Sequence, residues 1–157
     1  MEPKIISRDE IKLVGMQYIG SDISEISKMW CSFIQRTAEI KGRVNEKVCY
    51  GIGECTCEGE CKCGQGADFS YIAGVEVDSF DQLPAGMITR TLPASKYAVF
   101  THKGPLSALS TTYENVFTKW IPASGLQPDA NFAFEYYDER FNANSDNSEV
   151  DIYVPVK

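Results

Sequence analysis

The segment FAFEYYDERF, residues 132–141, places a carboxylate among aromatic side chains. If the segment forms a strand, alternate side chains point to opposite faces, so Glu135 shares a face with Tyr137. A carboxylate buried among aromatic rings costs several kcal/mol unless it is partnered, and burial raises its pKa. The first question is therefore what partner would justify a carboxylate at this position.

Three arrangements would justify a buried Glu135. A tyrosine hydroxyl could donate a hydrogen bond to it, or a cationic ligand held over aromatic faces could neutralise it. A raised pKa could also make it a general acid or base that activates water. Alternation alone leaves a fourth possibility open, in which Glu135 lies on the solvent-exposed face of a sheet.

Other catalytic patterns are weak in this sequence. His102 is the single histidine, and no Gly-x-Ser-x-Gly segment supports a Ser-His-Asp triad. We expect His102 to lie at the surface or at the rim of a groove. No glycine-rich phosphate loop precedes a helix, so nothing indicates nucleotide binding.

Four of the six cysteines fall in the short segment ECTCEGECKCG. Their spacing, C-x-C-x3-C-x-C, would allow four thiolates to bind Zn²⁺ tetrahedrally, or the softer Cu(I). The spacing differs from the C-x2-C knuckles of common zinc ribbons, and a flexible insertion with reactive thiols is the alternative. The candidate metal ligands are Cys55, Cys57, Cys61 and Cys63. No other cofactor is indicated.

Length and composition limit the class of protein. The 157 residues suit one domain, 1–157, with a sizeable core, and 43% of them are hydrophobic. The net charge of -7 argues against a nucleic-acid-binding surface. No apolar run approaches the roughly 20 residues of a membrane span, and the N-terminus has no apolar signal region. Because the cysteines are clustered and no signal peptide is visible, we expect reduced thiols in a cytoplasmic protein that binds neither DNA nor membranes directly.

The first half of the chain predicts a strand, a helix and a strand pair. Residues 12–19, KLVGMQYI, favour a strand, and the apolar positions of 20–40 repeat at helical spacing after a capping residue, Asp22. VCYGIG and SYIAGVEV then predict two strands joined by the cysteine-rich loop 54–66.

The second half predicts the same order of elements. Residues 86–104 supply strand material, Pro105 opens a helix, and FAFEYYDERF and EVDIYVPVK predict a second hairpin. The chain is therefore expected to form β-α-β-β twice, in halves of about 1–80 and 81–157. The predicted fold is α+β, with a mainly antiparallel sheet and both helices on one face.

Two helices side by side on a sheet leave a groove, and small-molecule sites favour grooves lined by aromatic side chains with a few polar groups. We expect Trp30 and Trp120, one from each helix, to wall the groove, and Tyr137, Tyr153 and Tyr97 to assist the carboxylate. An apolar helical stripe that only packs the core is the alternative. The candidate ligand-binding residues are Glu135, Trp30, Phe33, Tyr97, Tyr113, Phe117, Trp120, Tyr137 and Tyr153.

Several segments occur in an order that resembles a known family. These are SYIAGVEV, PAGM, PASKYAVFTHKG, a helix ending in KWIPASG, FEYYDERF and EVDIYVPVK. Together they resemble the GyrI-like small-molecule-binding domains, also known as the effector-binding domains of AraC-type and MerR-type transcription regulators. The resemblance covers about residues 12–157. It implies a duplicated βαββ fold with a ligand groove between the halves, and it places the carboxylate of the family's Phe-Glu-x-Tyr motif on Glu135.

The resemblance also implies what such a protein does. Effector domains of this family bind lipophilic, often cationic, drugs, so we expect a small-molecule-binding protein with Glu135 as the polar anchor. Other members hydrolyse cyclopropane-containing toxins, which makes a hydrolase using Glu135 and Tyr137 the first alternative. A member that protects DNA gyrase makes a protein that binds gyrase or a transcription regulator the second. The sequence shows no helix-turn-helix segment, so direct DNA binding is not expected.

Overall fold

The computed structural model describes residues 3–20, 22–55, 69–81, 83–129, 132–142 and 145–157. Its strands are β1 (Lys4–Arg8), β2 (Ile11–Gly20), β3 (Cys49–Cys55), β4 (Phe69–Glu76), β5 (Ile88–Leu92), β6 (Ser95–Lys103), β7 (Phe132–Tyr137) and β8 (Glu149–Val156). They form one sheet in the order β1-β6-β8-β7-β3-β4-β2-β5, and neighbouring strands are antiparallel. The central pair, β7 and β3, joins the two halves of the chain.

One helix crosses each half. Helix α1 (Ile23–Arg36) begins after Asp22, whose carboxylate accepts a hydrogen bond from the Ser24 backbone N–H at 2.9 Å. In the second half η2 (Leu106–Ala108), α2 (Leu109–Asn115), η3 (Val116–Trp120) and α3 (Ile121–Ser124) follow one another directly. The η3 segment is π-helical, and the series ends at Gly125, which has a positive φ of 74°. A short 3-10 turn, η1 (Thr37–Glu39), ends the first helix.

Each half contains one strand more than the predicted βαββ unit. Strand β1 pairs with β6 of the second half, and β5 pairs with β2 of the first, so each extra strand extends the other half's part of the sheet. If each strand of β1–β4 is exchanged with its counterpart in β5–β8, the same strand order results, read from the opposite edge of the sheet. Strand β1 was not predicted, because it is five residues long and mostly exposed at the sheet edge. Strand β5 lies within the predicted strand material of 86–104, which the structure divides into β5 and β6.

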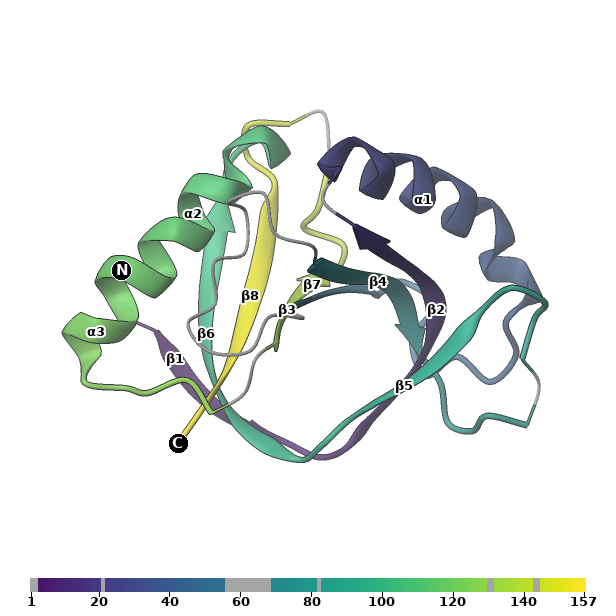
Figure 1. Cartoon of the computed structure of the whole chain (residues 1–157), viewed down its shortest axis with the longest axis horizontal. Helices are drawn as coiled ribbons and strands as arrows, with labels where there is room; N and C mark the ends of the chain where they lie inside the picture. The colour runs from purple at the N-terminus through teal and green to yellow at the C-terminus, as the bar shows by residue number, and fades with distance from the viewer. Residues whose placement is uncertain (1–2, 21, 56–68, 82, 130–131, 143–144) are drawn as a thin grey trace.

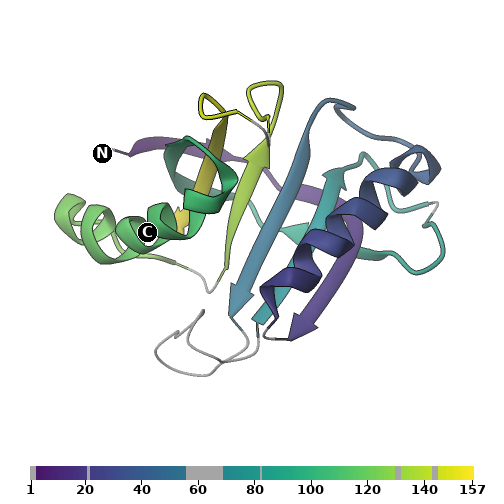
Figure 2. The same ribbon diagram turned by 90° about the horizontal axis from the view of Figure 1, so that it is seen from above.

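Both helical segments cover the same face of the sheet, as predicted (Figure 1). Under α1, Phe33 packs with residues of β2 and β4, including Val14 and Ala73. Under α2, η3 and α3, Val116 and Ile121 belong to a cluster that includes residues of β6, β7 and β8. Viewed from above, β3 and β7 run between the two helices (Figure 2). The middle of the sheet is thus the place where both helices can contribute side chains.

The other face of the sheet curls around its own hydrophobic cluster. This inner cluster is formed by Ile11, Leu13, Val48, Tyr50, Ile52, Ile72, Leu92, Tyr97, Val99, Phe132, Phe134 and Tyr153. Arg8, the last residue of β1, places its guanidinium over the rings of Tyr50, Tyr136 and Tyr153, at 5.9, 6.0 and 5.8 Å from their centroids. Since these tyrosines come from β3, β7 and β8, Arg8 ties the edge strand to the centre of the sheet.

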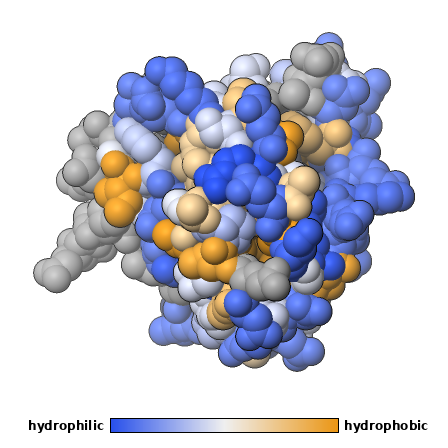
Figure 3. All heavy atoms as spheres, turned by 90° about the vertical axis from the view of Figure 1, so that its right-hand side faces the viewer, coloured by the Kyte–Doolittle hydropathy of each residue, from blue (hydrophilic) through white to orange (hydrophobic). Residues whose placement is uncertain are grey.

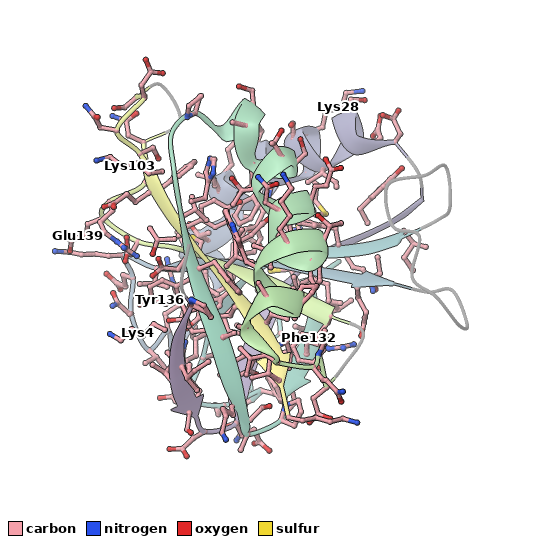
Figure 4. The ribbon with its side chains drawn as sticks, turned by 90° about the vertical axis from the view of Figure 1, so that its left-hand side faces the viewer. Lys4, Lys28, Lys103, Phe132, Tyr136 and Glu139 are labelled. Carbon is pink, nitrogen blue, oxygen red and sulfur yellow. The ribbon has the colours of Figure 1, made fainter. Side chains whose placement is uncertain are left out.

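Replacing Arg8 with Met should therefore lower the free energy of unfolding by about 1–2 kcal/mol, because Met keeps the apolar stem but loses the cation. The matched control is Lys4→Met on the same strand, since Lys4 is exposed (Figure 4) and its loss should cost less than about 0.5 kcal/mol. Urea denaturation measures both. Equal stabilities of the two variants would show that the tyrosine contacts of Arg8 do not anchor β1.

The outer surface near α1 carries hydrophobic side chains in separate areas divided by polar ones (Figure 3). Among the described residues, the large hydrophobic side chains that are exposed are Ile5, Ile19, Ile34, Val44, Leu83 and Phe117. Single exposed apolar residues of this kind are ordinary for a protein surface. The surface in this view therefore does not by itself indicate a partner interface.

Candidate functional site

Glu135 lies in the middle of the sheet on the face covered by the helices. Its strand, β7, pairs with β8 on one side and β3 on the other, which puts Glu135 opposite Ile152 and Gly51. The residue is only 5% exposed, so the solvent-exposed arrangement that alternation left open is excluded. On the opposite face, Phe132 belongs to the inner cluster and Tyr136 packs against it; the two lie near the two ends of β7 (Figure 4).

Three tyrosine hydroxyls converge on the Glu135 carboxylate from three elements. The Tyr71 hydroxyl of β4 donates to Glu135 Oε2 at 2.5 Å, and the Tyr137 hydroxyl donates to the same oxygen at 2.8 Å. Tyr113 of α2 also lies close enough to Glu135 to lower the pKa of its carboxyl group. Short O–H···O⁻ bonds of this kind are the stronger, charge-assisted class. The site is therefore a carboxylate held by phenol donors.

Burial dominates the electrostatics of this cluster. Removal from water raises the pKa of Glu135, and the hydrogen bonds from Tyr71, Tyr137 and Tyr113 offset part of that rise. Burial and the adjacent carboxylate raise the pKa of each of the three tyrosines well above its ordinary value. Among the described residues, no Lys, Arg or His contributes to the shift of Glu135. Its negative charge thus has no protein cation to balance it there.

Because Gly51 has no side chain, the Tyr71 hydroxyl and the Glu135 carboxylate can approach each other above it. A Cβ at position 51 would overlap both the Tyr71 hydroxyl and Glu135 Oε2. Neither Gly51 nor Tyr71 was among the residues predicted for the site. Alternation in SYIAGVEV does place Tyr71 on one face with Ala73 and Val75, but only the pairing of β3 with both β4 and β7 brings it to Glu135.

Two aromatic groups surround the carboxylate cluster. The Trp30 ring of α1 lies edge-to-face against Tyr71 and Tyr137, with ring centroids 6.4 and 5.4 Å apart. On the other helix, Tyr113 and Phe117 stack in parallel with centroids 6.4 Å apart. Of the predicted set, the structure brings Trp30, Tyr113 and Tyr137 around Glu135, and Tyr71, which the sequence did not predict, joins them. Phe117 is 43% exposed and stacks on Tyr113. The predicted residue Phe33 is fully buried beside Trp30 as part of the core.

The structure corrects the placement of three predicted residues. Tyr153 was expected beside Glu135, but the register pairs Glu135 with Ile152, so Tyr153 points to the inner face and stacks on Phe134 at 4.6 Å. Tyr97 belongs to the same inner cluster. Trp120 was expected to wall the groove and instead stacks on Phe100 of β6, in the cluster beneath α2, η3 and α3.

Among the described residues beside Glu135, the rings of Trp30 and Tyr137 pack edge-to-face with centroids 5.4 Å apart. Two surface depressions border Lys41 and Gly42, and neither is lined by a predicted ligand-binding residue.

His102 is a fourth correction, because it is buried rather than at the surface, with 4% of its area exposed. Its Nδ1 lies 2.6 Å from Thr112 Oγ1 and its Nε2 lies 3.1 Å from the Pro105 carbonyl oxygen. A carbonyl only accepts, so Nε2 carries the hydrogen of that contact, and in a neutral ring Nδ1 accepts from Thr112. His102 therefore fixes the start of the second helical segment to β6 and makes no contact with Glu135 that would suit a catalytic role.

The predicted metal ligands lie largely outside the described residues. Cys57, Cys61 and Cys63 are in that part of the chain, and Cys55 is described only as the last backbone position of β3. The hairpin predicted to carry the loop is present, since Cys55 pairs with Phe69 across β3 and β4. Within the described ranges, no group of three or more His, Cys, Asp or Glu side chains is arranged to hold a metal ion. Zn²⁺ or Cu(I) binding by the loop stays a prediction.

Comparison with known proteins identifies the family. The integron-associated effector binding protein family, Cass2, matches residues 4–156. The chain belongs to this family. It is 38% identical to the transcriptional regulator BrlR of Pseudomonas aeruginosa strain PAO1, over 99% of this chain and 56% of BrlR. The chain thus spans little more than half of that regulator's length.

Solved structures with low sequence identity to this chain show the same fold. The structure of SAV2435 bound to tetraphenylphosphonium is 21% identical with a TM-score of 0.71, and the match covers 100% of this chain and 94% of that chain. The EcmrR C-terminal domain is 19% identical with a TM-score of 0.73, and the match covers 99% of this chain and 97% of that chain.

Among the described residues of this chain, no helix is both long and apolar enough to cross a membrane.

Proposed function

We propose that this chain binds a lipophilic cation, with Glu135 as the counter-ion at the bottom of an aromatic site. The observation that carries the proposal is the composition of the cluster: a buried carboxylate whose recorded partners are tyrosine hydroxyls and which no described basic residue neutralises. A buried unpaired charge costs free energy that a bound cation would recover. Membership of an effector-binding family supports this function.

The aromatic side chains suit the apolar part of such a ligand. Rings of Trp30, Tyr71, Tyr113 and Tyr137 lie around the carboxylate, and aromatic faces attract cations. Because Glu135 is buried and the Trp30 and Tyr137 rings touch, a ligand must separate these rings to reach it. We propose that this separation occurs between α1 and the α2 segment, which lie on either side of β7.

The relatives support the ligand class and suggest a context. SAV2435 was solved with tetraphenylphosphonium, a permanently charged lipophilic cation. BrlR is a transcriptional regulator, so a role of the present chain as the ligand-sensing part of gene regulation is a further proposal. The alternative in which the chain binds DNA gyrase has no support from these comparisons.

A hydrolase that uses Glu135 as a general base is the second candidate. The observation that favours it is the raised pKa of a carboxylate in a water-poor site, with Tyr137 in hydrogen-bonding contact. Product formation from a cyclopropane-containing electrophile would establish it. Binding without turnover would reject it and leave the cation-binding function.

A pair of ions of the same shape tests the charge preference directly. Tetraphenylphosphonium and tetraphenylborate both carry four phenyl groups but have opposite charges. Isothermal titration calorimetry should show binding of the phosphonium and at least 100-fold weaker binding of the borate, an expected difference of about 3 kcal/mol. Equal affinities would mean that apolar contacts alone hold the ligand and that Glu135 does not act as its counter-ion.

Binding of tetraphenylphosphonium should also depend on pH. The ligand does not titrate, so its affinity should fall as the pH is lowered through the folded-state pKa of Glu135, which burial raises above its ordinary value. Calorimetry between about pH 4 and pH 8 measures this, with an ordinary glutamate pKa of about 4.3 as the reference. An affinity that is constant down to that reference value would show that the ionised form of Glu135 is not required.

A further inference from the structure

A hydrogen-bond chain leads from helix α1 to the carboxylate. The Trp30 indole nitrogen lies 3.2 Å from the Tyr71 hydroxyl oxygen, and that hydroxyl lies 2.5 Å from Glu135 Oε2. An indole N–H can only donate, whereas a phenol can donate or accept. Trp30 therefore uses the Tyr71 oxygen as its acceptor, and the hydroxyl hydrogen of Tyr71 points to Glu135.

We propose that Trp30 is a positioning residue for the ligand site: by donating to Tyr71, it sets the direction of the chain so that Glu135 accepts and stays in the anionic form that a cation requires. This inference rests on the proposed function. It gives helix α1 a role in ligand binding, which Trp30 exerts through Tyr71. The aromatic face of Trp30 would contact the ligand in any case, so the new element is the N–H group.

The direction of this hydrogen-bond chain matters because the other polar groups around Glu135 can act as donors or as acceptors. From β7 and α2, Tyr137 donates to the carboxylate and Tyr113 lies close enough to lower its pKa, and both phenols can act as donors or acceptors. On the strands that flank β7, the residues opposite Glu135 are Gly51 and Ile152, which have no titratable side chain. Trp30 is thus the one member of the described cluster that can act only as a donor.

Loss of the indole N–H would release Tyr71 from its fixed direction. Its oxygen could then accept a hydrogen bond from a protonated Glu135, which would stabilise the neutral acid. Hydrogen bonds to the neutral form of a carboxyl group disfavour its charged form. A variant without the N–H should therefore lose cation binding at a higher pH than the natural protein does.

The test replaces Trp30 with benzothienylalanine, an isostere in which sulfur takes the place of the N–H group, introduced by nonsense suppression. The matched control is the same replacement of Trp120, which stacks on Phe100 away from the carboxylate. The readout is the affinity for tetraphenylphosphonium as a function of pH.

The position-30 variant should bind roughly three- to tenfold more weakly than the natural protein at the pH where natural binding is half lost, and nearly equally at high pH. The position-120 variant should follow the natural curve. A position-30 curve that coincides with the natural one, or that is lowered by the same factor at every pH, would overturn the proposal, since packing alone would explain it.

Trp30→Phe is the second variant, which keeps an aromatic ring without the N–H and requires no suppression. It should show the same displacement of the curve to higher pH, with an added uniform loss from its smaller ring. Failure of the underlying cation-binding function would look different. In that case Glu135→Gln would bind the phosphonium as the natural protein does, and no variant would show a pH-dependent loss.

Discussion

Replacing Glu135 with Gln should weaken the binding of tetraphenylphosphonium by roughly 30- to 1000-fold, or about 2–4 kcal/mol. Gln keeps the size and the acceptor oxygen of the side chain but removes the negative charge. The loss should be large because the carboxylate is buried and no described basic residue balances it, so the ligand is its expected counter-ion. Isothermal titration calorimetry at neutral pH measures the difference.

The same variant should be at least as stable as the natural protein without ligand. The folded-state pKa of Glu135 is raised, so the folded state binds more protons than the unfolded state between the ordinary pKa and the raised one. The stability of the natural protein should therefore rise as the pH falls through this window. Glu135→Gln lacks this contribution, and its advantage should be greatest above the window and disappear below it.

Glu139→Gln is the matched control for charge removal. It is the same substitution four residues later, at a side chain that is 71% exposed and paired with Lys47 on the surface (Figure 4). It should bind tetraphenylphosphonium as the natural protein does. If Glu135→Gln and Glu139→Gln retain equal affinity, the cation is not held by the buried carboxylate.

Replacing Gly51 with Ala should lower the free energy of unfolding by about 1–3 kcal/mol and also weaken ligand binding. The added methyl group would overlap the Tyr71 hydroxyl and the Glu135 carboxylate, so the short hydrogen bond between them could not persist unchanged. Both neighbours lie in the packed interior of the sheet face, where displacement is costly. Urea denaturation and calorimetry with the phosphonium give the two readouts.

Gly53→Ala provides a control on the same strand and the same face. A Cβ at position 53 would meet no atom within 4 Å, so this variant should be as stable as the natural protein or slightly more stable. A loss of stability equal to that of Gly51→Ala would mean that β3 simply tolerates no side chain there. An unaffected Gly51→Ala protein would mean that Tyr71 and Glu135 can separate freely.

Local alternation was sufficient to predict that Glu135 shares a face with Tyr137, but neither which face is buried nor which residues of other strands are its neighbours. Phe132 and Phe134 point to the inner face, and Glu135 and Tyr137 point to the helix face, as period two requires. The partners across the strands depend on register, and a shift of one residue would move every side chain of a strand to the opposite face. Tyr153 was therefore placed on the wrong face, whereas Tyr71 was missed because it reaches Glu135 across an intervening strand.

Helical periodicity identified the apolar stripes but could not distinguish core from site. Trp30 and Trp120 were both predicted to wall the groove, yet Trp30 contacts the carboxylate cluster and Trp120 packs on Phe100. The segment Val116–Trp120 is π-helical, so its side chains are rotated relative to those of a regular α-helix. No pattern in the sequence predicted this. His102 was misplaced because its partners, Thr112 and the Pro105 carbonyl, depend on the turn between β6 and α2.

The most direct test of the central claim is the ionisation of Glu135 itself, followed by NMR of protein labelled with ¹³C at the glutamate carboxyl carbons. The resonance that disappears in Glu135→Gln should titrate above the ordinary glutamate pKa of about 4.3, because the site is buried. Saturation with tetraphenylphosphonium should move this titration to lower pH, since a bound cation favours the carboxylate. A titration of Glu135 that is the same with and without the bound ligand would contradict the account.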